Sequence, residues 1–311
     1  MPPVVSINLC CYNGEKYLEE ALQSVFSQTY KDWELVVIND GSTDSTEDII
    51  KRYISMGWPI VYHYQSNAGV GAARNKALEL SSGSIIAFID QDDVWMTNKL
   101  EKQIPLFDDP TVGLVFSDAI LFNEDGKSER LYSKRPYYTG YCFSSLLSDY
   151  FLTIQTVVIR RSALDTQDEW FDPRFNMIEE ADLFRRISYK WKSDMVIDPL
   201  SKYRVHSSNL TFTKPHLLHE ETLLMLRKYR KIFPEFNNKF FKEIKILKQK
   251  VKINNSITLM SLGNKYEARI CLFPFLFSNM KILILFLITF FPMSIISSIL
   301  KHRMILPSDK K

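Results

Sequence analysis

The stretch that decides the fold is IIAFIDQDDVW, residues 85–95. Five apolar residues run without a break from Ile85 to Ile89, which is typical of a strand buried on both faces in a parallel sheet. Three carboxylates follow at once, on Asp90, Asp92 and Asp93. Open α/β folds bind ligands beyond the carboxyl ends of their strands, so we expect these acids to lie at a ligand site.

Three carboxylates so close in sequence repel one another, and a divalent cation would relieve that repulsion. Oxygen ligands suit Mg²⁺ or Mn²⁺, and a Mg²⁺ site commonly shares its ion with the phosphates of a substrate. The alternative is an acidic turn that only caps the following helix. The stretch by itself leaves both interpretations open.

Outward from this stretch, apolar strands alternate with segments of helical spacing. The predicted strands are Val4–Cys11, Trp33–Ile38, Ile60–Tyr64 and Ile85–Ile89, and the predicted helices between them are Glu15–Ser27, Thr46–Met56 and Gly71–Leu80. This alternation predicts an α/β fold, a three-layer α/β/α sandwich with a mostly parallel central sheet. Beyond Trp95 the alternation is lost, and we expect antiparallel edge strands and a substrate-binding half that complete a catalytic domain over residues 1–215.

Charge divides the chain of 311 residues unevenly. Residues 1–221 hold 22 Lys and Arg against 32 Asp and Glu, whereas residues 222–311 hold 17 against 4. A basic segment of this kind indicates an anionic partner, either a membrane surface or a nucleic acid. The four cysteines show no metal-ligand spacing and no disulfide framework, so we expect a reducing compartment.

The basic segment reads as helix from Leu217 onward. Residues 282–300 then form a run of nineteen residues without a charge, flanked by Lys281 and Lys301. Length and flanks satisfy the rule for a membrane-spanning helix, while Pro292 and several serines fit a helix pair in the membrane interface equally well. A buried helical hairpin is the third possibility. We expect residues 216–311 to be a membrane-associated tail with no nucleic-acid partner, because its basic residues alternate with aliphatic stretches.

Further candidate ligand residues follow the other strands. Tyr12 ends the first strand, and Asp40 follows the second in NDGSTD, residues 39–44. Parallel strands bring both to the same sheet edge as the acids after Ile89, although a packing tyrosine and an Asx turn are the plainer interpretations. The run NAGVGAAR, residues 67–74, lacks the third glycine of a dinucleotide motif, but a helix N-terminus that carries Arg74 suits an anionic ligand.

Together these motifs resemble the family-2 glycosyltransferases of the GT-A fold. The family's hallmarks appear in order over residues 4–210: Y-N at 12–13, N-D-G-S-x-D at 39–44, N-x-G-x-x-x-A-R-N at 67–75 and D-x-D-D at 90–93. The resemblance implies transfer of a sugar from a nucleotide-diphosphate donor to an acceptor hydroxyl, with inversion at the anomeric carbon.

The resemblance also implies roles for the donor-side residues. Asp40 binds the nucleotide base and Tyr12 lies against its ring, while Arg74 faces the donor nucleotide. Asp90 binds the ribose or the metal, and Asp92 binds the Mn²⁺ or Mg²⁺ that bridges the diphosphate of the donor.

The acceptor side rests on the segment EEADLFRR, residues 179–186, which resembles the family's E-D pair and x-D-L-x-x-R helix. Glu180 falls on the family's catalytic aspartate and is the implied general base, with Glu179 as the runner-up. Both can equally be acids that complement a helix N-terminus. His206, in a Y-R-x-H segment, is implied as a metal or diphosphate ligand, and Gln155 and Asp93 as acceptor or supporting residues.

The basic tail indicates the acceptor and the location. We expect a lipid-linked glycan acceptor at the cytoplasmic face of the plasma membrane, used in building a bacterial surface polysaccharide such as an O-antigen or a capsule. Two alternatives stay open: a polyprenyl-phosphate sugar synthase, and a non-catalytic protein that binds nucleotide sugars, which the glutamate at position 180 would favour.

Overall fold

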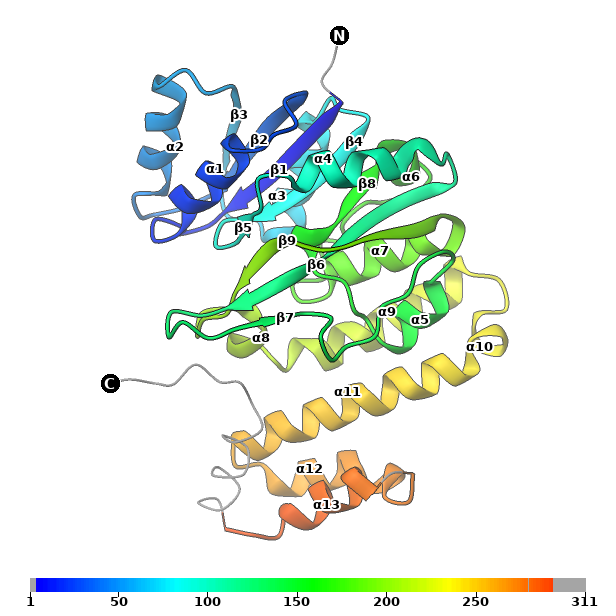
Figure 1. The fold of residues 1–311 in the computed structure, drawn as a ribbon. Helices are drawn as coiled ribbons and strands as arrows, with labels where there is room; N and C mark the ends of the chain where they lie inside the picture. The colour runs from blue at the N-terminus through cyan, green and yellow to red at the C-terminus, as the bar shows by residue number, and fades with distance from the viewer. Residues whose placement is uncertain (1–3, 279, 293–311) are drawn as a thin grey trace. The chain divides into compact units, whose positions relative to one another are not determined.

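The structure, a computed structural model, describes residues 4–278 and 280–292 (Figure 1). The chain divides into two compact units, of which the first comprises Met1–Leu146 and Tyr150–Val205 and the second Leu147–Asp149 and His206–Lys311. The functional division expected from the sequence, a catalytic domain over residues 1–215 and a tail over residues 216–311, remains a prediction.

The first unit is built on one large sheet. Its strands are β1 (Val5–Cys11), β2 (Trp33–Asp40), β3 (Ile60–Gln65), β4 (Ile85–Asp90), β5 (Val94–Trp95), β6 (Val112–Phe122), β7 (Ser128–Arg130), β8 (Val158–Arg160) and β9 (Lys192–Arg204). The strand order is β3-β2-β1-β4-β8-β6-β9-β5, with β7 paired to β6. Strands β1 to β4 run parallel to one another, as do β6 and β9, while β5, β7 and β8 pair antiparallel with their neighbours. The predicted α/β fold with a mostly parallel sheet is confirmed.

Helices cover both faces of this sheet. They are α1 (Leu18–Phe26), α2 (Thr46–Ser55), α3 (Val70–Leu80), α4 (Lys99–Gln103), α5 (Phe143–Ser148), α6 (Arg161–Asp165) and α7 (Glu179–Lys190), with 3₁₀ turns η1 (Ile104–Asp108) and η2 (Ile154–Thr156). Side chains along a strand point alternately to the two faces, so each strand supplies two cores. Residues of α1, α2 and α4 share one core with β1, β2 and β4, and residues of α3, α6 and α7 pack in cores with β2, β4 and β6.

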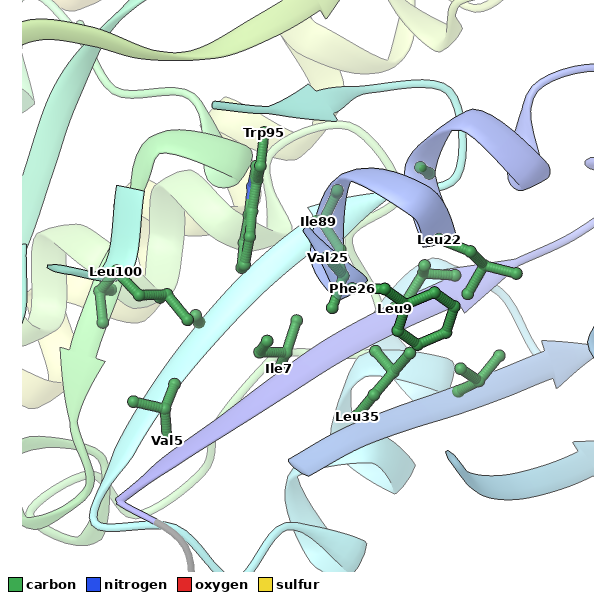
Figure 2. Close-up of a cluster of buried hydrophobic side chains, with 14 of the residues drawn as sticks. Val5, Ile7, Leu9, Leu22, Val25, Phe26, Leu35, Ile89, Trp95 and Leu100 are labelled. Carbon is green, nitrogen blue, oxygen red and sulfur yellow. The ribbon is translucent and has the colours of Figure 1, made fainter. Parts of the chain in front are cut away.

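The first core shows this alternation clearly. Figure 2 shows Val5, Ile7 and Leu9 along β1, with Leu9 near Leu22, Val25 and Phe26 of α1. On the opposite face, Phe88 of β4 meets Phe171 edge-on, with ring centroids 5.7 Å apart. The uninterrupted apolar run of β4 is therefore explained by burial on both faces, as its sequence predicted.

Strand register brings the candidate site residues to one edge. Cys10 of β1 lies opposite both Ile38 of β2 and Asp90 of β4, and Asp40 lies opposite Gln65 of β3. The residues that follow these strands therefore emerge together at the carboxyl edge of the sheet.

The segment after β5 changes helix type along its length. It is α-helical from Lys99 only to Gln103 and continues as the 3₁₀ turn η1, because Pro105 lacks the N–H that an α-helix interior needs. The polar stretch after β6 contains the short strand β7.

The described part of the second unit is helical. Its elements are α8 (Leu210–Thr213), α9 (Leu217–Ile232), α10 (Phe236–Lys239), α11 (Phe241–Ser261), α12 (Lys265–Leu272), the 3₁₀ turn η3 (Phe273–Phe275) and α13 (Met280–Ile288). A small core joins α11, α12 and α13 through Met260, Ala268, Leu272, Ile282, Leu285 and Ile288.

The predicted apolar run over residues 282–300 is only partly covered by α13. This helix ends at Ile288 and gives way to tight turns, in which the N–H of Phe291 donates to the carbonyl of Ile288. Residues 293–300 of the run lie outside the described residues. Across residues 4–278 and 280–292, no helix combines the length and the apolar character needed to cross a bilayer.

We expect Leu9→Ala to destabilise the first unit by about 2–5 kcal/mol, because Leu9 is fully buried and the truncation leaves a cavity. All five tryptophans lie between residues 33 and 191, so tryptophan fluorescence during urea unfolding reports on this unit. Ile197→Ala, at an exposed position of β9, is the control and should change stability by less than about 0.5 kcal/mol. Equal losses in the two variants would contradict the core assignment.

Candidate active site

The loops after β1 and β2 hold each other in place. The Oδ1 atom of Asn13 accepts the N–H of Thr43 at 2.8 Å, and the N–H of Asn13 donates to Oγ of Ser42 at 3.0 Å. The N–H of Gly14 donates to Oγ1 of Thr46 at 2.8 Å. Asn13 has a φ of 50°, a left-handed conformation that asparagine tolerates better than most residues. The Y-N and N-D-G-S-x-D motifs are thus explained by mutual hydrogen bonding.

Tyr12 is fixed through its backbone. The side-chain amide of Gln91 accepts the Tyr12 N–H at 2.9 Å and donates to the Tyr12 carbonyl at 3.1 Å. The ring of Tyr12 stays about half exposed, at 49%. An exposed ring can stack on a planar ligand, and the stacking of Tyr12 on a nucleotide base remains a prediction.

Asp40 is buried and organises the start of α3. Its Oδ1 atom accepts hydrogen bonds from the side chain of Gln65 at 2.7 Å and the N–H of Ala68 at 2.9 Å, and Oδ2 accepts the N–H of Gly69 at 3.0 Å. Gly69 has a φ of +89°, which requires glycine. A carboxylate has about four acceptor positions, so these three donors leave one for a ligand. The predicted role of Asp40 toward a base remains a prediction.

Arg74 is buried and joins two elements of the site. Its guanidinium donates to Asp90 at the end of β4 at 2.9 Å and to Glu179 at the start of α7. Burial by itself would lower the pKa of Arg74, but the charges of Asp90, Glu179 and Glu180 outweigh it and raise that pKa. Arg74 is permanently charged here and neutralises the acids of the site. Its guanidinium is bound by protein carboxylates, and its predicted role toward the donor nucleotide remains a prediction.

Glu180 lies next to the ion pairs of Arg74 and, like Asp90, is partly exposed. Its Oε1 atom accepts a hydrogen bond from the Tyr150 hydroxyl at 3.2 Å. Burial raises the pKa of Glu180 to about 8, Arg74 opposes that rise, and the negative charges of Glu179 and Asp90 add to it. Its neighbour Glu179 is buried in the ion pair with Arg74. Of the two glutamates that the sequence singled out, Glu180 has both the access and the proton affinity of a general base near neutral pH.

Arg204 donates hydrogen bonds to the acidic turn that contains Asp92 and Asp93. Its backbone N–H donates to Oδ1 of Asp93 at 2.9 Å, and its Nε–H donates to the Asp92 carbonyl at 2.9 Å. The guanidinium lies 4.5 Å from the ring centroids of both Tyr17 and Phe122. The sequence did not predict this role, although Arg204 belongs to the Y-R-x-H segment.

The acidic turn can bind a cation only if a bound ligand, such as a diphosphate, supplies further oxygen atoms. Asp93 is buried, and within the described chain its Oδ2 atom has no hydrogen-bond partner. Across residues 4–278 and 280–292, no group of three or more His, Cys, Asp or Glu side chains could hold a metal ion. Mg²⁺ is often bound by one or two carboxylates plus substrate phosphates, so Asp90 and Asp92 fit an ion that a diphosphate helps to hold.

His206 lies in the second unit, directly after β9. Its backbone N–H donates to Oδ1 of Asn209 at 2.7 Å, and its Nε2 atom lies 3.3 Å from Nδ2 of the same residue. Its place in a metal shell remains a prediction.

Gln155 lies in a rigidly held segment, η2. The indole N–H of Trp95 donates to the Gln155 carbonyl at 3.1 Å, and Lys99 and Gln103 donate to the Thr156 carbonyl. Burial lowers the pKa of Lys99 well below its usual range. The Nε2 atom of Gln155 is buried and has no hydrogen-bond partner within the described part of the chain. A role for Gln155 toward an acceptor remains a prediction.

The D-L-x-x-R pattern has a structural explanation. Asp182 and Arg186 form a buried ion pair on successive turns of α7, with Nε and Oδ2 3.0 Å apart. Arg186 also donates to the carbonyls of Glu169 and Trp170. The pair therefore anchors the loop that leads to Glu179 and Glu180. The residue that sequence reasoning missed entirely is Tyr150, because no local pattern ties it to Glu180.

Comparison with known proteins identifies the family. The family model described as Glycosyl transferase family 2 matches residues 6–167, just over half of the chain. The chain belongs to glycosyl transferase family 2. The family resemblance drawn from the four sequence motifs is thereby confirmed.

Several curated members of family 2 are similar to the chain. The putative teichuronic acid biosynthesis glycosyltransferase TuaG from Bacillus subtilis is 38% identical over 40% of this chain and 50% of its own length. The putative glycosyltransferase EpsH from Bacillus subtilis is 28% identical over 83% of this chain and 77% of its own. An uncharacterized glycosyltransferase from Rickettsia typhi is 31% identical over 70% of this chain and 69% of its own. The match thus spans half the length of the first relative and more of the other two.

Two solved structures share the fold. TarS 1-349 from S. aureus in complex with UDP-GlcNAc has a TM-score of 0.56 and 19% identity, over 87% of this chain and 88% of that one. The mannosyltransferase PcManGT from Pyrobaculum calidifontis in complex with GDP-Man and Mn²⁺ has a TM-score of 0.64 and 16% identity, over 97% of this chain and 85% of that one. At such low identity these two likenesses establish the fold alone.

We expect Arg74→Met to destabilise the first unit by about 3–5 kcal/mol, because it leaves buried carboxylates without their cation. Adding Glu179→Gln should recover part of the loss, since one of those charges is then removed. The control is Arg52→Gln, which breaks the ion pair with Glu19 in which both side chains are about half exposed, and should cost less than about 1 kcal/mol. Urea unfolding followed by tryptophan fluorescence measures all three, and a loss equal to that of the control would contradict the buried pair.

Proposed function

We propose that this protein transfers a sugar from a nucleotide-diphosphate donor to a hydroxyl group of a glycan acceptor, with inversion at the anomeric carbon. The observation that carries the proposal is the environment of Glu180. It is a partly exposed carboxylate with a pKa of about 8, next to the group that Arg74 forms with Asp90 and Glu179. Membership of glycosyl transferase family 2 supports the reaction class.

The chemistry requires one base from the protein. Glu180 takes the proton of the acceptor hydroxyl as its oxygen attacks the anomeric carbon, and the bond from that carbon to the diphosphate oxygen breaks. The nucleoside diphosphate leaves with the bonding electron pair. A single displacement inverts the anomeric configuration, whereas a retaining double displacement would require a carboxylate nucleophile as well.

The donor side is supplied by residues at the carboxyl edge of the sheet. Tyr12 stacks on the nucleotide base, and Asp40 offers its remaining acceptor position to an N–H of that base. Asp90 would bind the ribose or a divalent cation, Mn²⁺ or Mg²⁺, which Asp92 would help to hold. Such a cation would stabilise charge on the departing diphosphate. The complexes of TarS with UDP-GlcNAc and of PcManGT with GDP-Man and Mn²⁺ support this donor class.

The acceptor that we propose is a lipid-linked glycan at the cytoplasmic face of the plasma membrane. The name of TuaG, a teichuronic acid biosynthesis glycosyltransferase, supports a role in a bacterial surface polysaccharide. The basic composition of residues 222–311 supports an anionic surface as partner.

Calorimetric titration with a panel of nucleotide sugars in the presence of Mn²⁺, followed by analysis of the transfer product, tests the proposal as a whole. A new glycosidic bond to a glycan is the expected product. An acid-labile sugar on a polyprenyl phosphate would identify a polyprenyl-phosphate sugar synthase instead. Binding of a nucleotide sugar without turnover would identify a non-catalytic binding protein.

Activity should depend on pH through Glu180. Glu180 acts as a base only when it is deprotonated. In assays with Mg²⁺, kcat/KM should therefore fall about tenfold for each pH unit below the Glu180 pKa of about 8. The hydrogen bond from Tyr150 lowers the pKa of Glu180, so Tyr150→Phe should move this acid limb to higher pH. Tyr64→Phe, at an exposed position, should leave the profile unchanged.

Removal of the proposed base should severely lower the rate of sugar transfer. Glu180→Gln should lower kcat by about 10²–10⁴-fold while nucleotide-sugar affinity stays within a few-fold, because Glu180 acts on the acceptor and not on the donor. Glu79→Gln, at an exposed position of α3, is the matched control. A normal kcat in Glu180→Gln would remove Glu180 from the mechanism.

Loss of a metal ligand should instead weaken the donor complex. We expect Asp92→Asn to abolish the Mn²⁺-dependent part of nucleotide-sugar affinity, measured by calorimetry with and without EDTA. Asp198→Asn, which changes an exposed aspartate paired with Lys102, should retain it. Mn²⁺-dependent binding that is unchanged in Asp92→Asn would refute the metal role of the acidic turn.

A further inference from the structure

Helices α12 and α13 each have two apolar sides. One side enters the small core shared with α11, through Ala268 and Leu272 of α12 and through Ile282, Leu285 and Ile288 of α13. The other side is solvent-exposed along both helices and the turns that follow them.

The exposed side chains follow the same helical spacing twice. They recur at i, i+4, i+7 and i+11 and comprise Tyr266, Ile270, Phe273 and Phe277, then Met280, Ile284, Leu287 and Phe291. Their exposed fractions run from 43% at Ile284 to 98% at Phe277. These eight residues are called the apolar stripe below. Tyr266 and Ile270 lie on α12 and Met280, Ile284 and Leu287 on α13, at the spacing of a helix face that packs against a partner. Phe273, Phe277 and Phe291 extend this face into η3 and the turns.

Helix α13 is apolar on all of its sides. Its sequence is MKILILFLI, nine residues with one charge. At about 1.5 Å per residue it is about 14 Å long, against the roughly 30 Å of a bilayer's hydrocarbon core. A short helix that is apolar all round and only half covered by protein suits the plane of a membrane interface, where one side meets acyl chains.

The surrounding charge selects the kind of partner. Residues 240–292 contain eight Lys and Arg and only two acids, Glu243 and Glu267. A second copy of the same surface would bring like charges together across a two-fold interface. An anionic lipid leaflet attracts them, by about 1 kcal/mol for each basic residue near the surface.

We propose that the apolar stripe of α12 and α13 is a membrane-docking face that inserts its aromatic and aliphatic side chains into the acyl boundary of an anionic leaflet. This proposal rests on the proposed function only for the biological purpose of docking, which is to bring the enzyme to a lipid-linked acceptor. Binding to lipid itself needs neither donor nor acceptor, so its test is independent of catalysis.

The experiment is flotation of the full chain with vesicles of phosphatidylcholine containing 30% phosphatidylglycerol, without any nucleotide sugar. The wild-type chain should float with the vesicles, and binding should fall at least tenfold when phosphatidylglycerol is left out. Phe273→Ser/Phe277→Ser/Leu287→Ser should also lose at least tenfold, because three inserted side chains are removed. These positions are exposed and lie outside the core of α11, α12 and α13, so the fold of the variant should persist, as circular dichroism can verify.

Met56→Ser/Ile197→Ser, at exposed apolar positions of the first unit, is the control and should bind like the wild type. Equal flotation of the wild type and the triple variant would overturn the proposal. So would a lipid-free dimer that the triple variant dissociates, which would assign the stripe to a second copy. An environment-sensitive dye on Phe277→Cys that is already shielded in the lipid-free monomer would assign it to the chain's own residues 293–311. Transfer to a soluble acceptor, assayed on the same variants, reports separately on the proposed function.

Discussion

The active site depends on one buried cation. Arg74 lies on α3 and binds Asp90 of β4, 16 positions away, and Glu179 of α7, 105 positions away. Without that charge, Asp90, Glu179 and Glu180 would be three poorly solvated carboxylates close together. Their mutual repulsion would destabilise the folded state. Arg74 therefore connects the carboxyl edge of the sheet to the helix that carries Glu180, the proposed base. It also sets a limit on the proton affinity of Glu180, whose pKa would otherwise rise further.

The first half of the fold is predictable because its signals are local. The apolar run from Ile85 to Ile89 defines a strand buried on both faces, and its neighbours along the chain alternate with helices, so only a parallel sheet accommodates them. Parallel strands then bring Tyr12, Asp40 and Asp90 to one edge without any knowledge of tertiary contacts. The strand register agrees with that inference residue by residue.

The remaining site contacts arise from residues distant in the sequence, and no local pattern carries them. Tyr150 reaches Glu180 from 30 positions away, and Arg204 reaches the acidic turn from more than 100. Arg74 illustrates the same limit. A helix N-terminus with an arginine suggests an anionic ligand, but only the tertiary structure shows that the anions bound are Asp90 and Glu179. Sequence spacing gives the residue types of a site more readily than their partners.

The C-terminal helices show why hydropathy alone does not determine how an apolar segment is used. A window over residues 282–300 combines the helix that ends at Ile288 with residues outside the described part of the chain, so its average hydropathy suggests a span that the described helix does not provide by itself. A helix of nine residues is too short to cross a bilayer. The free energy that stabilises this helix in place comes from the burial of its apolar side chains. One side of α13 is covered by α11 and α12, and the other is left apolar within a segment rich in lysine and arginine, so an anionic membrane interface would suit both its apolar side and the charge of the segment.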